Sequence, residues 1–192
     1  MTQHIQPRRY IGKGIIFGTI GGIVGGIVMM AIMIGMFGMM NLPSDTFAKL
    51  IGMTMGQQPQ SASGVGMAIH LLSSIVIGAI FGAVTSSIKK IGITGYGRGI
   101  AFGTATGVIA FIVLFLPVMM GAMPTQMMSL MKMMNGTMYP AMSSQMIMTQ
   151  MQKLQPMILG GAFLAHIIYG AILGWITTVL VTKTGLRRSG DP

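Results

Sequence analysis

The sequence predicts an all-α fold: a bundle of four transmembrane helices made of two tandem helical hairpins, with short interfacial helices in the outer connections. The 192-residue chain has a mean hydropathy of +0.75 and 7% charged residues, whereas soluble domains carry about 25%. It also contains four long stretches without a charge, and small residues recur every fourth position within them. We therefore predict a single integral membrane domain over residues 1–192.

Each predicted span is long enough for a bilayer. The first covers residues 14–40, and 27 residues at about 1.5 Å each cross a hydrocarbon core of about 30 Å with some tilt. The spans cover about residues 14–40, 64–87, 99–121 and 157–181. Glycines at every fourth position leave a flat helix face on which a second backbone can lie closely. The predicted helix-packing glycines are Gly14, Gly18, Gly22, Gly26, Gly78, Gly82, Gly99, Gly103, Gly107, Gly170 and Gly174.

The basic residues predict the orientation of the chain. Nine of the twelve flank the spans on one side: Arg8, Arg9, Lys13, Lys89, Lys90, Arg98, Lys183, Arg187 and Arg188. Cytoplasmic connections carry the excess of Lys and Arg, so we expect a multi-pass protein of the cell membrane with both termini in the cytoplasm. The formal charge of +10 lies beside apolar spans, which indicates a lipid bilayer rather than a nucleic acid as the partner.

The two halves of the sequence resemble each other. The segment from Lys13 to Thr19 matches the segment from Arg98 to Thr104 at an offset of 85, and His70 and His166 each begin a series of small residues at every fourth position. The pattern predicts two hairpins related by an axis along the membrane normal. Similarity between membrane helices that share a small residue alphabet is the alternative explanation.

Histidine and methionine are the candidate metal ligands. His70 lies 19 residues before Lys89 and His166 lies 17 before Lys183, which places both about 26–28 Å from the cytoplasmic side at about 1.5 Å per residue. Imidazole and thioether suit Cu(I). The candidate ligands are His70, His166, Met33, Met119, Met120, Met127, Met131 and Met134. Alternatively, the histidines make interfacial hydrogen bonds, or they hold a haem b between two helices.

Methionine is concentrated in the outer connection over residues 122–156. From Met119 to Met157 the chain has 14 of its 24 methionines. On a helix Met120, Met123, Met127, Met131 and Met134 share one face, and such a segment can collect a soft cation. A methionine stripe is also an ordinary packing surface. Asn135 begins an Asn-Gly-Thr glycosylation sequon, which equally suits the turn that ends a short helix.

Enzymatic chemistry is not indicated. The chain lacks cysteine and glutamate, and its two acids, Asp45 and Asp191, lie outside the spans. Carboxylate pairs and Cys nucleophiles are therefore absent, and the sequence has no nucleotide-binding loop or zinc-protease helix. We predict no enzyme.

Three features together allow a family comparison: the glycine-rich first span, the Leu42-Pro43-x-Asp45 connection, and the spans with a histidine followed by small residues. They resemble small uncharacterised four-helix membrane proteins of bacteria and archaea, over about residues 12–120 and 157–182. In composition alone the chain is similar to accessory membrane subunits of copper-dependent complexes such as archaeal ammonia monooxygenase. The resemblance implies a fold and no activity.

Three functional hypotheses follow. We favour Cu(I) handling at the outer membrane face through methionine and histidine. The first alternative is an accessory subunit whose glycine faces bind other helices in a homo-oligomer or a larger membrane complex, with no cofactor. The second alternative is a bis-histidine haem protein.

Overall fold

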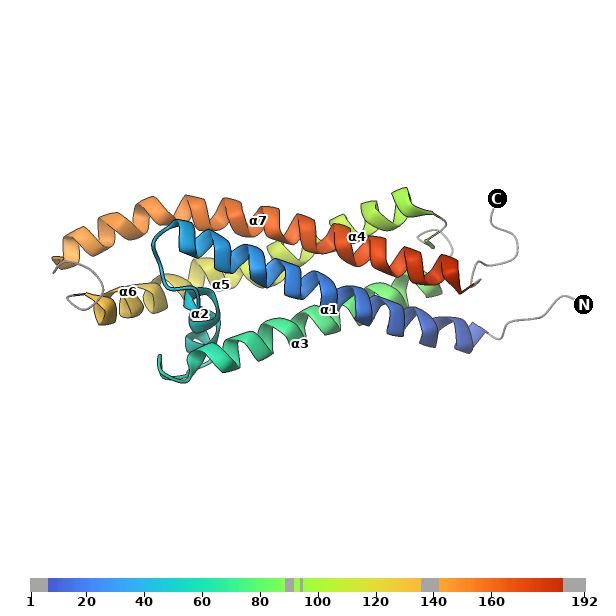
Figure 1. Ribbon diagram of the computed structural model, residues 1–192, viewed down its shortest axis with the longest axis horizontal. Helices are drawn as coiled ribbons and strands as arrows, with labels where there is room; N and C mark the ends of the chain where they lie inside the picture. Colours follow the sequence, from blue (N-terminus) through green and yellow to red (C-terminus); the bar gives the residue numbers. More distant parts are fainter. Residues whose placement is uncertain (1–6, 89–91, 94, 136–141, 185–192) are drawn as a thin grey trace, which may run out of the picture. The chain divides into compact units, whose positions relative to one another are not determined.

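The computed structural model describes residues 7–88, 92–93, 95–135 and 142–184. These residues form helices and contain no β-strand (Figure 1). The helices are α1 (Pro7–Met39), α2 (Thr46–Thr54), α3 (Ala62–Ser87), α4 (Tyr96–Ala110), η2 (Phe111–Phe115), α5 (Leu116–Gly121), α6 (Met123–Met134) and α7 (Ser144–Lys183). The basic residues Lys89, Lys90, Arg187 and Arg188, used above to predict orientation, lie outside the described residues.

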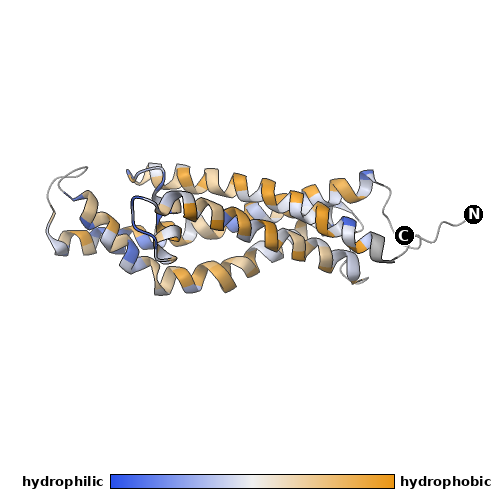
Figure 2. Cartoon of the chain, turned by 90° about the horizontal axis from the view of Figure 1, so that it is seen from below, coloured by the Kyte–Doolittle hydropathy of each residue, from blue (hydrophilic) through white to orange (hydrophobic). Residues whose placement is uncertain are grey.

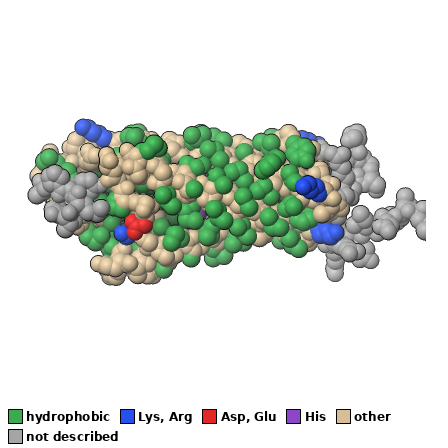
Figure 3. All heavy atoms as spheres, in the orientation of Figure 1, with side chains coloured by type: hydrophobic (Ala, Val, Ile, Leu, Met, Phe, Trp, Pro, Cys, Tyr) green, Lys and Arg blue, Asp and Glu red, His purple; other side chains and the backbone are tan. Residues whose placement is uncertain are grey.

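Four helical stretches in the described part of the chain are long and apolar enough to cross a membrane, which confirms the all-α prediction and the four long apolar helices. They are Tyr10–Met39, Ala62–Ser87, Tyr96–Gly121 and Ser144–Lys183. Hydrophobic residues extend along most of each of these helices (Figure 2), and hydrophobic side chains are spread over the face seen in Figure 3. Leu72 is 60% exposed and Val113 is 61% exposed. Large apolar side chains on the outside of a helix bundle are typical of contact with lipid.

The third long helix widens in its middle. Residues Phe111–Phe115 form a π-helical turn, η2, between α4 and α5. Pro117 follows within the first turn of α5, and proline has no N–H to donate to the carbonyl four residues earlier. Local widening of the helix before a proline is one way to accommodate the missing hydrogen bond.

By its internal contacts the chain divides into two compact units, the first made of three segments and the second of two. Unit 1 comprises Met1–Met29, Leu71–Ala110 and His166–Pro192, and unit 2 comprises Met30–His70 and Phe111–Ala165, the latter segment joining η2, α5 and α6 to the first half of α7. The helices α1, α3 and α7 contribute residues to both units. Each unit is described separately below.

Unit 1 contains two helix pairs, α1 with α3 and α4 with α7, and the backbones of the two helices in each pair are in close contact. In α1 against α3, a methyl group added at Gly18 would lie 2.8 Å from the Cα of Gly82. In α4 against α7, a methyl group added at Gly103 would lie 2.7 Å from the Cα of Gly174. All eleven glycines listed above as helix-packing residues are buried and face another helix of unit 1. The approach of the backbones therefore depends on the missing side chains.

The contacts also show how the two pairs correspond. Gly22 faces the carbonyl of Ser74, whereas Gly107 faces the carbonyl of His166. Gly78 faces the carbonyl of Gly18, and Gly170 faces that of Gly103. The residue of α3 that corresponds to His166 is thus Ser74, one turn away from the predicted equivalent, His70. The prediction that His70 and His166 occupy equivalent positions in their helix pairs is therefore wrong by one helical turn.

One end of unit 1 brings together the beginning of α1 and the ends of α3 and α7. A small cavity of about 10 Å³ is lined there by Tyr10, Ser86 and Val181, among others, together with Ile93 from the link before α4. Helices α1 and α3 therefore run in opposite directions. Deeper in the unit, the hydroxyl of Tyr169 in α7 donates to the carbonyl of Ser74 in α3 over 3.0 Å, and Tyr169 is 2% exposed.

In unit 2, α2 is fixed between the first two long helices. Lys49 and Asp45 form an ion pair at 2.9 Å, and Ser63 at the start of α3 donates to the same carboxylate oxygen. Burial alone would raise the pKa of Asp45, but the hydrogen bonds from Lys49 and Ser63 outweigh it and hold the pKa below the ordinary value. Helix α2 (Thr46–Thr54) is a short helix in the connection between the first two predicted spans, and its location at a membrane interface stays a prediction.

The Met-rich connection of unit 2 is helical for most of its length. Helix α6 covers its first part, and α7 begins at Ser144, 13 residues before the predicted start of the fourth span. Buried residues of α7 repeat with helical spacing through this extension, at Ile147, Leu154 and Ile158. Pro156 lies inside α7 and removes only one backbone donor, so the helix continues through it.

Candidate functional site: a methionine-lined pocket

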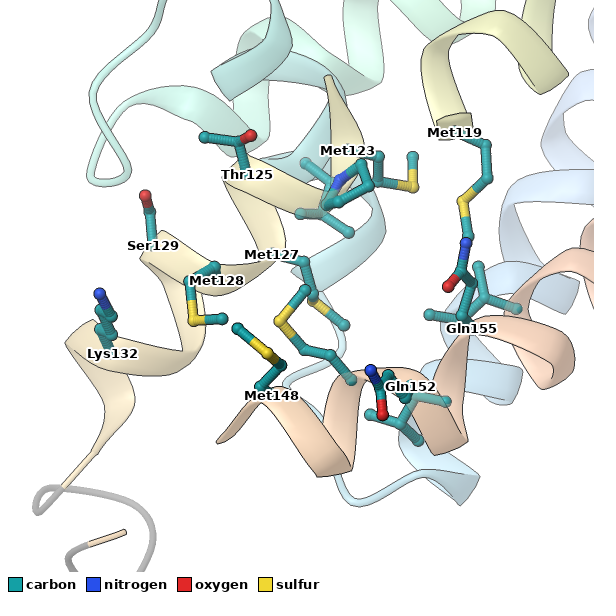
Figure 4. Close-up of a pocket in the computed structure, with 15 residues that line it drawn as sticks. Met119, Met123, Thr125, Met127, Met128, Ser129, Lys132, Met148, Gln152 and Gln155 are labelled. Carbon is teal, nitrogen blue, oxygen red and sulfur yellow. The ribbon is translucent and has the colours of Figure 1, made fainter. Parts of the chain in front are cut away.

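A cavity of unit 2 lies between the Met-rich helices. It has a volume of about 550 Å³, and its lining comes from α5, α6, the first half of α7 and Leu50 of α2 (Figure 4). Six thioether side chains line it: Met119, Met123, Met127, Met128, Met148 and Met151. Helix α2 packs against α6, and Leu50, which is fully buried, forms part of the wall. The pocket therefore combines soft sulfur donors with an apolar wall.

The polar groups of the pocket are few and lie mainly on its outer side. Gln152 and Gln155 come from α7, and Ser129 and Lys132 come from α6; all four residues are exposed. Lys132 is the charged residue of the lining, which contains no carboxylate. The pocket thus lacks the carboxylates by which Mg²⁺ and Ca²⁺ are usually bound.

The two methionine-bearing helices are joined by a side-chain clasp. The amide of Asn135, at the end of α6, donates to the carbonyl of Met142 over 2.9 Å and accepts from the N–H of Met142 over 2.7 Å. Both polar atoms of the side chain are engaged, as expected for the residue that ends a helix. The Nδ2 atom that glycosylation of the sequon would modify is the atom that donates to Met142.

The structure brings only part of the predicted ligand set to this pocket. Met119 and Met127 line it. Met131 and Met134 share the buried face of α6 with Met123 and Met127, each at most 4% exposed, but they do not line the cavity. Met120 is 64% exposed, so its predicted place on this face is wrong. Met119 precedes Met123 by four residues, whereas Met120 precedes it by three. One helical turn has about 3.6 residues, so Met119 is the one nearer to a full turn and takes the inner position.

The remaining predicted ligands, Met33, His70 and His166, lie away from the pocket lining. Met33 of α1 is fully buried in unit 2. His70 belongs to unit 2 and is 9% exposed; its ring meets the ring of Phe47 edge to face at a centroid distance of 5.3 Å. This contact attaches α2 to α3, which is a packing role. His166 belongs to unit 1 and is 7% exposed. Within the described residues, no three His, Cys, Asp or Glu side chains form a group that could hold a metal ion.

The haem hypothesis required space beside the histidines for a flat ring. The small residues after His166 are occupied instead, because Gly170 faces the backbone of Gly103 and Gly174 faces the backbone of Gly99. A porphyrin has no room at these positions. The same contacts bear on the subunit hypothesis, since the glycine faces are used within the chain and a partner helix must bind elsewhere.

Sequence reasoning missed four lining methionines as ligands: Met123, Met128, Met148 and Met151. Met123 and Met128 belong to the recognised Met-rich segment. The two from α7 were missed because the segment before Met157 was interpreted as a connection. The helical spacing of Ile147, Met151, Leu154 and Ile158 is the signal that identifies it as a helix with an inward face.

Comparisons with protein-family models, curated proteins and solved structures give no match for this chain. The fold and the pocket therefore define a class: a helical protein with four apolar helices compatible with a membrane, which carries a methionine-lined pocket in one of its two units.

Proposed function

We propose that this chain is a multi-pass membrane protein that binds Cu(I) through the thioethers of the pocket in unit 2. The observation that carries the proposal is the meeting of six methionines from three helices around one cavity without a carboxylate. Thioether sulfur is a soft ligand that selects Cu(I) over hard divalent cations, and the chain has no cysteine to compete for the ion. Relative to the sequence hypothesis, the proposed ligands change from a mixed set to methionine alone.

The proposed location is the outer side of the cell membrane. Residues 122–156 connect the third and fourth spans, and the clustered Lys and Arg residues support cytoplasmic termini. In unit 1 the start of α1 and the ends of α3 and α7 meet at one end, which agrees with basic flanks on a common side. With this orientation the Met-rich connection is extracytoplasmic. A soft cation from outside the cell would therefore meet this connection first.

A competition titration tests the proposal. Purified protein in mild detergent is titrated against a chromophoric Cu(I) chelator under reducing conditions. The double variant Met123→Leu with Met127→Leu removes two buried thioethers with little change of side-chain volume, and Leu for Met is among the best tolerated core substitutions. Its affinity for Cu(I) should fall by at least about tenfold, as for other losses from a metal site.

The control is the double variant Met133→Leu with Met146→Leu. Both residues are exposed, at 43% and 56%, and neither lines the pocket. Its affinity should equal that of the unmodified chain. Equal affinity of the pocket variant and the control would rule out the pocket as the binding site.

The pocket volume supports a second candidate, an apolar organic ligand. About 550 Å³ is far more than one ion occupies and falls within the range of about 300–1,000 Å³ for small-molecule sites. Methionine is a flexible side chain that adapts to varied apolar ligands. Binding of a fluorescent fatty acid should be weakened by bound Cu(I) and by substitution of the lining methionines. Binding that is unaffected by both would contradict this candidate.

A further inference from the structure

The six methionines of the pocket differ sharply in exposure. Met148 is 55% exposed, Met128 and Met151 are half-buried, and Met119, Met123 and Met127 are each 4% exposed. The soft donors therefore form a series from the surface to the interior of unit 2. A pocket whose methionines served only to fill space needs no thioether at its exposed rim, where leucine or a polar residue would serve equally.

The series follows the arrangement of the helices. In Figure 4, Met128 from α6 and Met148 from α7 extend toward one another across the pocket. Met127, Met123 and Met119 follow at four-residue intervals, so they occupy successive turns from α6 back into α5. Consecutive thioethers one helical turn apart are about 5–6 Å from each other at their Cβ atoms, a distance that flexible methionine side chains can bridge.

The chemistry of ligand exchange suits such a series. Thioethers are neutral, so an ion that passes from one to the next keeps its charge, and no proton is bound or released. Cu(I) is satisfied by two or three soft donors, which lets a new thioether bind before the previous one leaves. The ammonium of Lys132 at the rim repels cations weakly in water, and the inner methionines carry no such charge.

We infer that the pocket works in two tiers, with Met148 as the residue that captures a soft monovalent cation and with Met127, Met123 and Met119 as the residues that retain it. This inference rests on the proposed function and adds a direction to it. It assigns different roles to residues of the same chemical type. Met148 governs the rate of association, whereas the inner methionines govern the equilibrium affinity.

Stopped-flow transfer of Cu(I) from a chromophoric chelator to the full-length protein in detergent separates the two roles. Met148→Leu should slow association by about tenfold, the scale of losses from a metal site, and change the equilibrium affinity by less than about threefold. Met123→Leu with Met127→Leu should weaken affinity by about tenfold or more and leave the association rate within about twofold. Met148→Cys keeps a soft sulfur and should restore fast association, whereas Met148→Ser should not.

Met146→Leu is the matched control, because Met146 lies on the same helix, is 56% exposed and does not line the pocket. Circular dichroism and gel filtration establish that each variant is folded. Equal association rates for Met148→Leu and Met146→Leu would overturn the two-tier inference while the proposed function stands. Unchanged affinity in the inner double variant would overturn the proposed function itself.

Discussion

Replacement of Gly103 by alanine tests the packing of unit 1. The added methyl group would lie 2.7 Å from the Cα and the N of Gly174, both backbone atoms that cannot rotate away. The carbonyl oxygen of Gly170 lies closer still, and ordinary contact begins at 3.4 Å, so α4 and α7 must separate locally by more than about 0.7 Å. Overpacking of this kind costs about 1–3 kcal/mol. Alanine also favours a helix over glycine by up to about 1 kcal/mol, which offsets part of the loss.

The control for this prediction is Gly97→Ala in the same helix, because a methyl group there meets no atom within 4 Å. That variant gains the helix propensity without the clash, so the two should differ by the overpacking cost alone, about 1–3 kcal/mol. For a chain of this length, this corresponds to roughly 2–12 °C in Tm. Thermal unfolding in mild detergent, followed by loss of the monodisperse gel-filtration peak, measures the difference. Equal Tm values for the two variants would refute the close approach of α4 and α7.

Three further predictions concern individual hydrogen bonds. Tyr169→Phe removes the buried bond to the carbonyl of Ser74 and should lower stability by about 1 kcal/mol; an unchanged Tm would contradict it. The depressed pKa of Asp45 means that its stabilising contribution is complete above the ordinary value of 3.8 and is lost as the pH falls through the depressed value. Because Asp45 is partly exposed, Asp45→Asn should lower the free energy of unfolding by less than about 1 kcal/mol at pH 7. The variant should also lack the part of the stability loss in acid that Asp45 causes, which unfolding at pH 3 and pH 7 measures. Asn135→Ala should remove both hydrogen bonds to Met142 and therefore speed proteolysis between α6 and α7. It should also weaken Cu(I) binding by about tenfold. Proteolysis at the rate of the unmodified chain would show that these hydrogen bonds are dispensable.

The elements of the fold were largely predictable because the bilayer imposes length and apolarity. Four stretches without charge give four long helices, and their predicted limits differ by only a few residues at most ends. The exception is the start of α7 at Ser144, because the sequence prediction begins the fourth span at about Met157 and gives residues 122–156 as a connection. A helix outside the apolar span needs only one buried face, so polar residues on its other side are compatible with it.

The register between the helices was not predictable from the spacing of small residues. A pattern that repeats every four residues looks the same after a shift of four, so His70 and Ser74 were equally good equivalents of His166. Only the contacts of Gly22 and Gly107 distinguish them. The predicted equivalence of the two histidines rested on the wrong choice between these registers, whereas their predicted common depth came from the distance to Lys89 and Lys183. The duplication of the two halves stays a prediction.

The candidate site was partly predictable, because methionine content identified the segment but not the partners. The face of α6 followed from helical spacing, and Met123 and Met127 lie on it as expected. Met148 and Met151 come from a second helix, and sequence alone does not state which helix faces α6. The pocket therefore required the tertiary structure, whereas its soft-donor character followed from composition.

X-ray absorption at the copper K-edge of the Cu(I)-loaded protein tests the central claim most directly, because it reports which atoms bind the metal. We predict a first shell made of sulfur alone, which is lost in the variant with Met123→Leu and Met127→Leu. A first shell with imidazole nitrogen, or a copper content that is the same in this variant and in the unmodified chain, would contradict binding by the methionine-lined pocket.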